Sequence, residues 1–234
     1  MEIYISRITD ISNSVIHDLC SLIDDSQSER IMSFIDRKDA IRTLVGDLLI
    51  RSIFTEKHDM KKENIIFRRN AYGKPFIISN FDFHYNLSHS GDYVVCAIDD
   101  SPIGIDIEEI RNLEHELLSR NYFSESEYNF IKNDDDYVAL NNFYTIWTLK
   151  ESYVKCEGDG LSIPLDSFSI EIDKISNVKI YKNNQRLNAW LKLFSLESDY
   201  KMAVCSFHKK ISDTIINIDM EYLISQFLSH NNLR

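Results

Sequence analysis

The segment Ile103–Glu109, IGIDIEE, alternates apolar and polar positions with a period of two. This pattern is typical of a β-strand with one buried face, on which the isoleucines would point into a core. Asp106 and Glu108 would then share the opposite face, about 6.5–7 Å apart along the strand. Two carboxylates held on one strand face repel each other, and burial adds a further cost to both. The segment therefore raises the question of what stabilises them.

The pattern of apolar and polar positions also predicts further strands and helices. Short apolar or alternating runs predict strands, and longer runs with apolar residues every three or four positions predict helices. Strands are expected at 2–8, 64–69, 74–79, 92–99, 102–109, 168–172, 177–182, 189–196 and 200–207. Helices are expected at 13–23, 29–56, 127–133, 141–158 and 220–230. The polar stretch NLSHSGD, 86–92, is expected to be a loop, and AYGKP, 71–75, a turn.

Two short matches suggest an internal repeat. Thr-Leu pairs that begin at Thr43 and Thr148 lie in two of the predicted helices. Asp-Tyr pairs at Asp92 and Asp199 precede two apolar strands at a similar spacing. A duplication would give two similar α+β halves divided near Ser101, but chance similarity explains two such short matches equally well.

Glu151 and Lys155 are four residues apart on the predicted helix 141–158, so they share one face. They could form an ordinary ion pair worth about 0.2–0.5 kcal/mol. Alternatively, Glu151 is a metal ligand or base and Lys155 binds phosphate. The spacing leaves both interpretations open. At the matching positions of the repeat stand Gly46 and Ile50, so we expect one active site and not two.

Composition narrows the class of protein. The chain has 234 residues, 44% of them hydrophobic and 27% charged, enough for one large domain or two small ones. Its net charge of −11 disfavours a nucleic-acid partner, which would require a basic face. The four cysteines lack metal-binding or disulfide-framework spacing, and no signal peptide or membrane span is apparent. We therefore expect a cytoplasmic protein without a membrane partner.

The candidate chemistry is that of a hard metal and a phosphate ligand. Asp106 and Glu108 would be stable together if Mg²⁺ bridged them, because Mg²⁺ takes carboxylate, phosphate and water oxygens. Exposed surface acids are the alternative. Ser88 and His89 in the polar stretch and Lys74 in the turn could contact a phosphate, or could be plain turn residues. Together these groups indicate a pyrophosphate held by a metal and a few cations.

Four motifs, YGKP, NLSHSG, GIDIE and WTLKESYVKCEGDGLSIPLDSF, occur in this order along the chain. With KDAIRTLVGDLLIRS before them and YKMAVC after them, they closely resemble the Sfp-type 4′-phosphopantetheinyl transferases over nearly the whole chain. The resemblance implies an α+β fold, a pseudo-dimer of two similar halves that each pack a small antiparallel sheet against a long helix. Residues 1–101 would contact the phosphates and adenine of coenzyme A, and residues 102–234 would hold the magnesium site and dock the carrier protein.

The resemblance also implies roles for individual residues. Asp106, Glu108 and Glu151 would be the Mg²⁺ ligands, and Glu151 and Lys155 the catalytic residues. Gln27 stands where the family has a lysine, which puts part of the phosphate site in question. The residues that would contact coenzyme A, the substrate, are Lys74, Ser88, His89, Lys155 and, near the adenosine 3′-phosphate, Arg30 and Arg42.

The implied activity is Mg²⁺-dependent transfer of the 4′-phosphopantetheine arm of coenzyme A to a serine of an apo acyl or peptidyl carrier protein, with release of 3′,5′-ADP. Such carriers serve nonribosomal peptide, polyketide, fatty acid or antibiotic biosynthesis. The carrier would contact the segments around 121–128 and 157–168, with Phe123 and Leu161 as apolar anchors, and the enzyme would be a monomer. The alternatives are a non-catalytic module that binds coenzyme A or a carrier, and, with less support, a pyrophosphohydrolase.

Overall fold

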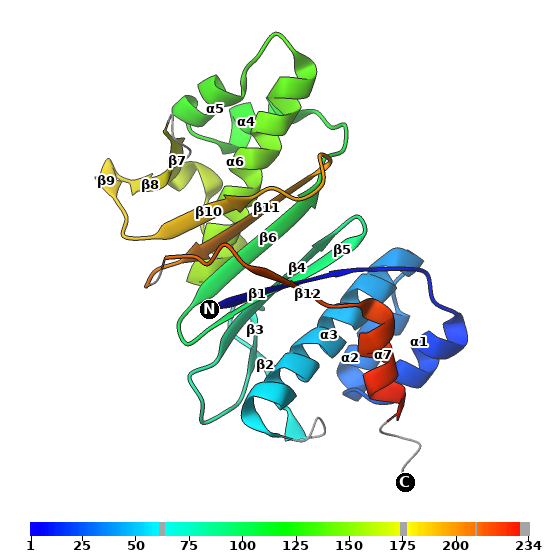
Figure 1. Ribbon diagram of the computed structural model, residues 1–234. Helices are drawn as coiled ribbons and strands as arrows, with labels where there is room; N and C mark the ends of the chain where they lie inside the picture. The colour runs from blue at the N-terminus through cyan, green and yellow to red at the C-terminus, as the bar shows by residue number, and fades with distance from the viewer. Residues whose placement is uncertain (61–63, 174–176, 209, 230–234) are drawn as a thin grey trace.

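The computed structural model describes residues 1–60, 64–173, 177–208 and 210–229. Its secondary structure is a mixed α+β fold in which strands cross the middle of the molecule and helices lie at both ends (Figure 1). None of the helices within these ranges is long and apolar enough to cross a membrane.

The N-terminal sheet has four strands: β1 (Glu2–Arg7), β4 (His84–Ser90), β5 (Tyr93–Asp99) and β12 (Ile215–Asn217). Their order is β12-β1-β5-β4. β5 pairs antiparallel with both β1 and β4, whereas β12 runs parallel to β1. A separate antiparallel hairpin, β2 (Phe67–Arg69) and β3 (Pro75–Ile77), lies beside β4.

The C-terminal sheet has three antiparallel strands: β6 (Ile103–Glu109), β10 (Trp190–Phe194) and β11 (Tyr200–Ser206). Their order is β10-β11-β6, so β6 is an edge strand of its own sheet. A smaller sheet follows α6 along the chain: β7 (Ser169–Ile172), β8 (Val178–Lys182) and β9 (Gln185–Arg186). The predicted strand at IGIDIEE is confirmed.

Two long helices, α3 (Arg37–His58) and α6 (Asp136–Glu157), have 22 residues each. Each begins after an aspartate, Asp36 or Asp135, whose side chain accepts two main-chain N–H groups of the first turn. The predicted helix at 29–56 is therefore two helices, because Asp36 caps α3 after α2 has ended. The shorter helices are α1 (Asn13–Cys20), α2 (Asp25–Met32), α4 (His115–Tyr122), α5 (Glu125–Ile131) and α7 (Met220–Ser229).

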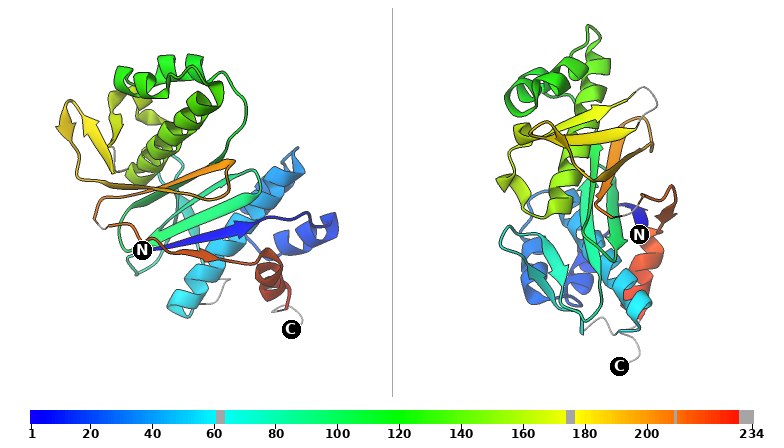
Figure 2. Two further views of the ribbon diagram at one scale, coloured as in Figure 1. Left: turned by 45° about the horizontal axis from the view of Figure 1, so that its top comes forward. Right: turned by 90° about the vertical axis from the view of Figure 1, so that its left-hand side faces the viewer.

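The helices form two groups at opposite ends of the molecule, as Figure 2 also shows. α1, α2 and α7 pack around α3, and α4 and α5 pack against α6. Three apolar cores result: one between α3 and the N-terminal sheet, one between α6 and the C-terminal sheet, and one on the other face of both sheets. The isoleucines of β6 belong to the third core together with Ile3, Ile5 and Val95, so this core joins the two sheets.

The end of the chain returns to the N-terminal sheet. β12 pairs with β1, and four side chains of α7 lie in the core beneath α3: Met220, Leu223, Ile224 and Phe227. Residues 215–229 were assigned to the second half by the predicted division at residue 101, yet they pack with the first half.

A buried ion pair holds α5 and the segment before β7 against α6. Lys150 and Glu127 are both fully buried, with Nζ and Oε1 2.8 Å apart. Nζ also donates to the carbonyl oxygens of Leu165 and Phe168, each at 2.7 Å, and Glu127 accepts the N–H of Ile170 at 2.6 Å. These hydrogen bonds satisfy both buried charges, so the pair is structural.

β6 and α6 approach each other closely at Gly104. A Cβ atom added there would lie 2.0 Å from the carbonyl oxygen of Ser152 and 2.4 Å from the main-chain nitrogen of Cys156. Both neighbours are main-chain atoms of α6, so neither can rotate away. Gly104 thus allows α6 to lie directly on the strand that carries Asp106 and Glu108.

Replacing Gly104 by alanine should lower the free energy of unfolding by about 3 kcal/mol or more, because α6 must move off β6. Urea unfolding followed by circular dichroism measures this. Gly46→Ala on α3 is the matched control: its Cβ would meet Val94 Cγ1 at 3.6 Å, an ordinary contact, and alanine favours helix by about 0.5–1 kcal/mol. A G104A protein as stable as G46A would contradict the close approach.

Candidate functional site

β4 and β6 lie side by side (Figure 1), but in the described residues they do not pair through their main chains. Side chains of β4 take the place of main-chain acceptors. The N–H groups of Ile105, Ile107 and Glu109 donate to Asn86 Oδ1, Ser88 Oγ and Ser90 Oγ, at 2.8, 3.4 and 3.0 Å respectively. We call Asn86, Ser88 and Ser90 the polar ladder. The prediction of a loop is wrong for residues 86–90, which belong to β4 and bind the neighbouring strand through their side chains; it is confirmed only for Gly91 and Asp92, which form the turn before β5.

The polar ladder also contacts the two carboxylates of β6. Because each serine oxygen accepts an N–H group, its own hydrogen is available to a second partner. Ser88 Oγ donates to Asp106 Oδ1 at 3.0 Å, and Ser90 Oγ donates to Glu108 Oε2 at 3.1 Å. The hydroxyl groups that join the strands therefore also orient the carboxylates.

Lys155 reaches Asp106 from α6. Its Nζ lies 2.6 Å from Asp106 Oδ1 and 2.9 Å from Ser88 Oγ. Burial raises the pKa of Asp106, which is 2% exposed, and the charge of Lys155 lowers it. The second oxygen, Asp106 Oδ2, is buried without a hydrogen-bond partner. The ion pair of Lys155 in the described residues is with Asp106, and not with Glu151 one helical turn away.

Glu108 and Glu151 line the same cavity as Asp106 and Lys155. Trp147 Nε1 donates to Glu108 Oε1 at 3.3 Å, so both oxygens of Glu108 have a neutral donor. Burial and the charge of Asp106 raise the pKa of Glu108 to about 7. Burial also raises the pKa of Glu151. This carboxylate cavity, of about 320 Å³, is further lined by Leu87, Ser88 and His89.

The carboxylate cavity fits a divalent cation that a substrate helps to coordinate. Within the described ranges no three Asp, Glu, His or Cys side chains are close enough to form a complete metal centre. Mg²⁺, however, usually binds through one or two carboxylates, with substrate phosphates and waters as its other ligands. The partnerless oxygen of Asp106 and the raised pKa values of Asp106, Glu108 and Glu151 all favour an added positive charge.

A larger cavity of about 610 Å³ adjoins the first, and the two share Leu87 and His89. It is lined by the N-terminal part of the chain, including Gln27 and Thr43. We call it the arginine cavity, because four arginines line it: Arg30, Arg42, Arg68 and Arg69.

Two buried polar groups of α3 are left without partners in the arginine cavity. Arg42 donates through Nη1 to the carbonyl oxygen of Gly91 at 2.6 Å and pairs through Nη2 with Asp39, but its Nε has no acceptor. The hydroxyl of Thr43 is likewise unpaired. Arg30 is exposed, yet partial desolvation at the cavity wall and the neighbouring charge of Arg69 lower its pKa. These groups would be satisfied by an anion.

His89 stands where the two cavities meet. Partial desolvation and the positive charge of Arg42 lower its pKa, so the imidazole is neutral near neutral pH and can still donate one hydrogen bond.

Lys74 lines neither cavity. Its Nζ donates to the main-chain carbonyls of Lys155, Ile103 at 3.2 Å and Cys156 at 3.5 Å. The structure thus brings together Asp106, Glu108, Glu151, Lys155, Ser88, His89, Arg30 and Arg42, but not Lys74.

Sequence reasoning missed several residues of the site. Asn86 and Ser90 carried a signal, because Asn86, Ser88 and Ser90 alternate with a period of two. Trp147 lies four residues before Glu151 and so on the same helical face. Thr43, Arg68 and Arg69 carried no such signal, since only the fold places them in the arginine cavity.

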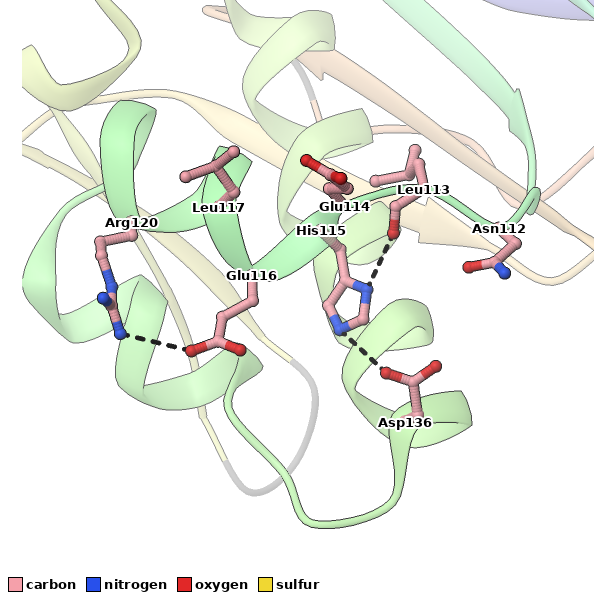
Figure 3. Close-up of a pocket in the computed structure, with 8 residues that line it drawn as sticks. All are labelled: Asn112, Leu113, Glu114, His115, Glu116, Leu117, Arg120 and Asp136. Atoms are coloured by element: carbon pink, nitrogen blue, oxygen red, sulfur yellow. Dashed lines mark hydrogen bonds and ion pairs between the residues drawn. The ribbon is translucent and has the colours of Figure 1, made fainter.

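A third cavity, of about 500 Å³, lies between the start of α4 and the start of α6 and shares no lining residue with the other two (Figure 3). Two pairs of its polar side chains contact each other: His115 Nε2 lies 3.5 Å from Asp136 Oδ1, and Arg120 donates to Glu116 at 3.3 Å. Nearby, Phe123 is buried and stacks on Phe143, with ring centroids 5.6 Å apart.

The structure bears on one of the two predicted carrier anchors, Phe123, and not on the other, Leu161. The prediction of Phe123 as an exposed anchor is wrong, because its apolar ring completes the core beneath α6. The side chain of Leu161 lies outside what the structure describes.

Two family models match adjacent parts of the chain. Residues 11–101 match "4′-phosphopantetheinyl transferase, N-terminal", and residues 102–205 match the 4′-phosphopantetheinyl transferase superfamily. The chain is 38% identical over 204 residues to the 4′-phosphopantetheinyl transferase Sfp of Bacillus subtilis (strain 168), which covers 87% of this chain and 91% of that protein. It is 34% identical to the 4′-phosphopantetheinyl transferase gsp of Aneurinibacillus migulanus, over 98% of both chains.

Solved structures show a weaker likeness. A holo-(acyl-carrier-protein) synthase from Bacillus anthracis in complex with CoA (3′,5′-ADP) has 20% identity and a TM-score of 0.37, over 44% of this chain and 92% of that one.

The stability of the ligand-free protein should fall as the pH rises from about 4.5 to about 7. The pKa of Glu108 is about 7 in the folded protein and about 4.5 in the unfolded chain, as for an ordinary glutamate, so ionising it costs folding free energy within this window. The loss is up to about 3 kcal/mol, since one pKa unit corresponds to about 1.4 kcal/mol. Thermal melts across this range should show a smaller decrease for Glu108→Gln. If the pH profile of E108Q equals that of the wild type, the pKa of Glu108 is not raised in the folded protein.

Proposed function

We propose, because the chain belongs to the 4′-phosphopantetheinyl transferase superfamily, that it transfers the 4′-phosphopantetheine arm of coenzyme A to a serine of an apo carrier protein and releases 3′,5′-ADP. The observation that carries this proposal is the continuity of the two cavities at Leu87 and His89. One elongated anionic ligand can place one phosphate group beside Lys155 and another among the arginines.

The two cavities suggest how coenzyme A binds. The adenosine 3′-phosphate would accept hydrogen bonds from the unpaired Arg42 Nε and Thr43 hydroxyl, and a charged hydrogen bond from Arg30. The pyrophosphate would lie between the two cavities, near His89 and Lys155. Lys74 is not part of this binding mode, since main-chain carbonyls hold its ammonium group.

The reaction is displacement at the β-phosphorus. The carrier serine oxygen forms a bond to this phosphorus, the bond to the bridging oxygen breaks, and 3′,5′-ADP leaves with the electron pair. Lys155 stabilises the negative charge that builds on the phosphoryl oxygens. Glu151 takes the serine proton; burial raises its pKa and so makes it a stronger base. Such general-base assistance typically contributes about 10²–10⁴-fold.

Asp106, Glu108 and Glu151 line one cavity without forming a complete metal centre by themselves, and they would hold Mg²⁺ once the substrate phosphates supply its remaining ligands. A bound ion would add positive charge beside the pyrophosphate. The partnerless oxygen of buried Asp106 and the raised pKa values of all three carboxylates support this assignment.

The proposed architecture is a pseudo-dimer with halves that meet at residues 101 and 102. Both sheets share one topology: the order β1-β5-β4 is matched by β6-β11-β10, with every pair antiparallel. α3 and α6 follow the first strand of each set and have equal length. The boundary between the two matched family models falls at the same place.

The carrier would dock near α4 and the segment after Lys155. Leu117 and Tyr122 of α4 are exposed apolar side chains that could contact it in place of buried Phe123. The chain and its acidic carrier would gain little from overall charge attraction, given a net charge of −11. We further propose a cytoplasmic monomer that serves carriers of peptide, polyketide, fatty acid or antibiotic biosynthesis.

Purified protein, Mg²⁺, coenzyme A and an apo carrier should increase the carrier mass by one phosphopantetheine arm, as measured by intact-protein mass spectrometry. Asp106→Asn and Glu151→Gln should lower the rate at least about 100-fold, because each removes a charge that the reaction needs. Glu171→Gln, at an exposed position of β7, is the matched control and should keep wild-type activity.

Two outcomes would point to the alternative functions. Release of 3′,5′-ADP without a carrier would indicate a hydrolase. Binding of coenzyme A without transfer to any member of a carrier panel would indicate a binding module.

Arg30→Ala should weaken the use of coenzyme A about 10- to 100-fold in kcat/KM, because a charged hydrogen bond contributes about 1.5–3 kcal/mol. The same variant should use 3′-dephospho-coenzyme A as well as the wild type does, because that substrate lacks the phosphate. Since Arg30 is exposed, the substitution should leave the fold intact. Equal losses on both substrates would contradict the placement of the 3′-phosphate.

A further inference from the structure

Ser90 makes two hydrogen bonds, one to the main chain of β6 and one to a carboxylate side chain. Its oxygen accepts the N–H of Glu109 at 3.0 Å, and its hydrogen is donated to Glu108 Oε2 at 3.1 Å. The accepted amide directs the hydroxyl hydrogen away from β6 main chain, so the carboxylate is the partner that remains. Ser90 thus joins two strands and holds one carboxylate.

Glu108 depends on this contact more than Asp106 depends on Ser88. Asp106 has the ammonium group of Lys155 at 2.6 Å as well as the hydroxyl of Ser88. Glu108 has no ion pair in the part of the chain that the structure describes; its donors are Ser90 from β4 and Trp147 from α6. Two neutral hydrogen bonds therefore set the orientation of this carboxylate.

The two donors come from different elements, Ser90 from β4 and Trp147 from α6. Ser90 holds Oε2 and Trp147 holds Oε1, so the carboxylate cannot turn about its last bond without losing one of them. Each carboxylate oxygen has two acceptor positions, so both can still bind a cation. Ser90 and Trp147 would therefore orient the Glu108 carboxylate as outer-shell groups orient a metal ligand.

We infer that Ser90 is a positioning residue that holds the carboxylate of Glu108 in the direction required to bind a hard divalent cation next to the pyrophosphate. This inference rests on the proposed function and assigns a role to a residue that does not touch substrate. Asn86 provides the comparison within the same polar ladder: it accepts the N–H of Ile105 at 2.8 Å and has no hydrogen bond to either carboxylate among the described contacts.

The test is a titration of Mn²⁺ into protein with saturating coenzyme A and no carrier, followed by electron paramagnetic resonance and corrected for coenzyme A alone. Ser90→Ala should weaken Mn²⁺ binding about 10- to 100-fold, as expected for removal of a group that orients a metal ligand. Ser90→Thr keeps the hydroxyl and should restore binding. Asn86→Ala removes one contact between β4 and β6 and should lower the melting temperature without weakening Mn²⁺ binding.

Kinetics provide a second readout. In the transfer assay, S90A should require a higher Mg²⁺ concentration for half-maximal rate, with a KM for coenzyme A close to that of the wild type. If S90A does not fold, Ser90→Cys keeps the size of the side chain with a weaker donor, and should shift Mn²⁺ affinity in the same direction.

Two results would overturn the inference: Mn²⁺ affinity unchanged in S90A, or equal losses in S90A and N86A, which would assign both to displacement of the strand. Transfer by the wild-type protein is measured in parallel. Active wild type with unchanged Mn²⁺ binding in S90A refutes the role of Ser90 alone, whereas wild type that binds Mn²⁺ but modifies no carrier refutes the proposed function.

Discussion

The contact between β4 and β6 is the constraint on which the site depends. Three main-chain N–H groups of β6 face a strand that offers them no carbonyl, and a buried N–H left unpaired costs about 1–3 kcal/mol. Side-chain oxygens at Asn86, Ser88 and Ser90 meet this need. Because hydroxyl groups both accept and donate, the same contacts bring hydrogen-bond donors to Asp106 and Glu108. The same serine hydroxyl groups therefore join the two sheets and orient the carboxylates of Asp106 and Glu108.

Cations gather at the two cavities, although the net charge of the molecule is negative. A chain of net charge −11 would repel an anionic ligand, yet four arginines gather in one cavity and Lys155 lies at the edge of the next. Asp106 is stabilised by Lys155 when no ligand is present. In the proposed binding mode, a phosphate group would compete for Lys155, and a cation would then take the place of Lys155 at Asp106. The ion pair between Lys155 and Asp106 would thus be replaced when substrate and metal bind together.

Period-two alternation predicted β6 correctly, and the four-residue spacing of Glu151 and Lys155 correctly placed both on the cavity face of α6. The polar ladder was predicted as a loop because strand rules assume that polar side chains face water; here they face another strand. Phe123 was misjudged for a related reason, because an aromatic ring looks the same in sequence whether it contacts a partner or packs in its own core. The role of Lys74 in binding coenzyme A stays a prediction; in the described residues its ammonium group contacts main-chain carbonyls. The arginine cavity combines α2, α3 and the β2–β3 hairpin, and local patterns contain no information about how these meet.

The return of the chain end to the N-terminal sheet has a consequence for how the protein forms. Synthesis proceeds from the N-terminus, and domains usually fold as they emerge from the ribosome. Here the first core lacks Met220, Leu223, Ile224 and Phe227 until α7 has been translated. A nascent chain that stops short of α7 would expose the underside of α3, a surface that chaperones recognise. Synthesis of α7, and not of the first hundred residues alone, is therefore what completes the first core.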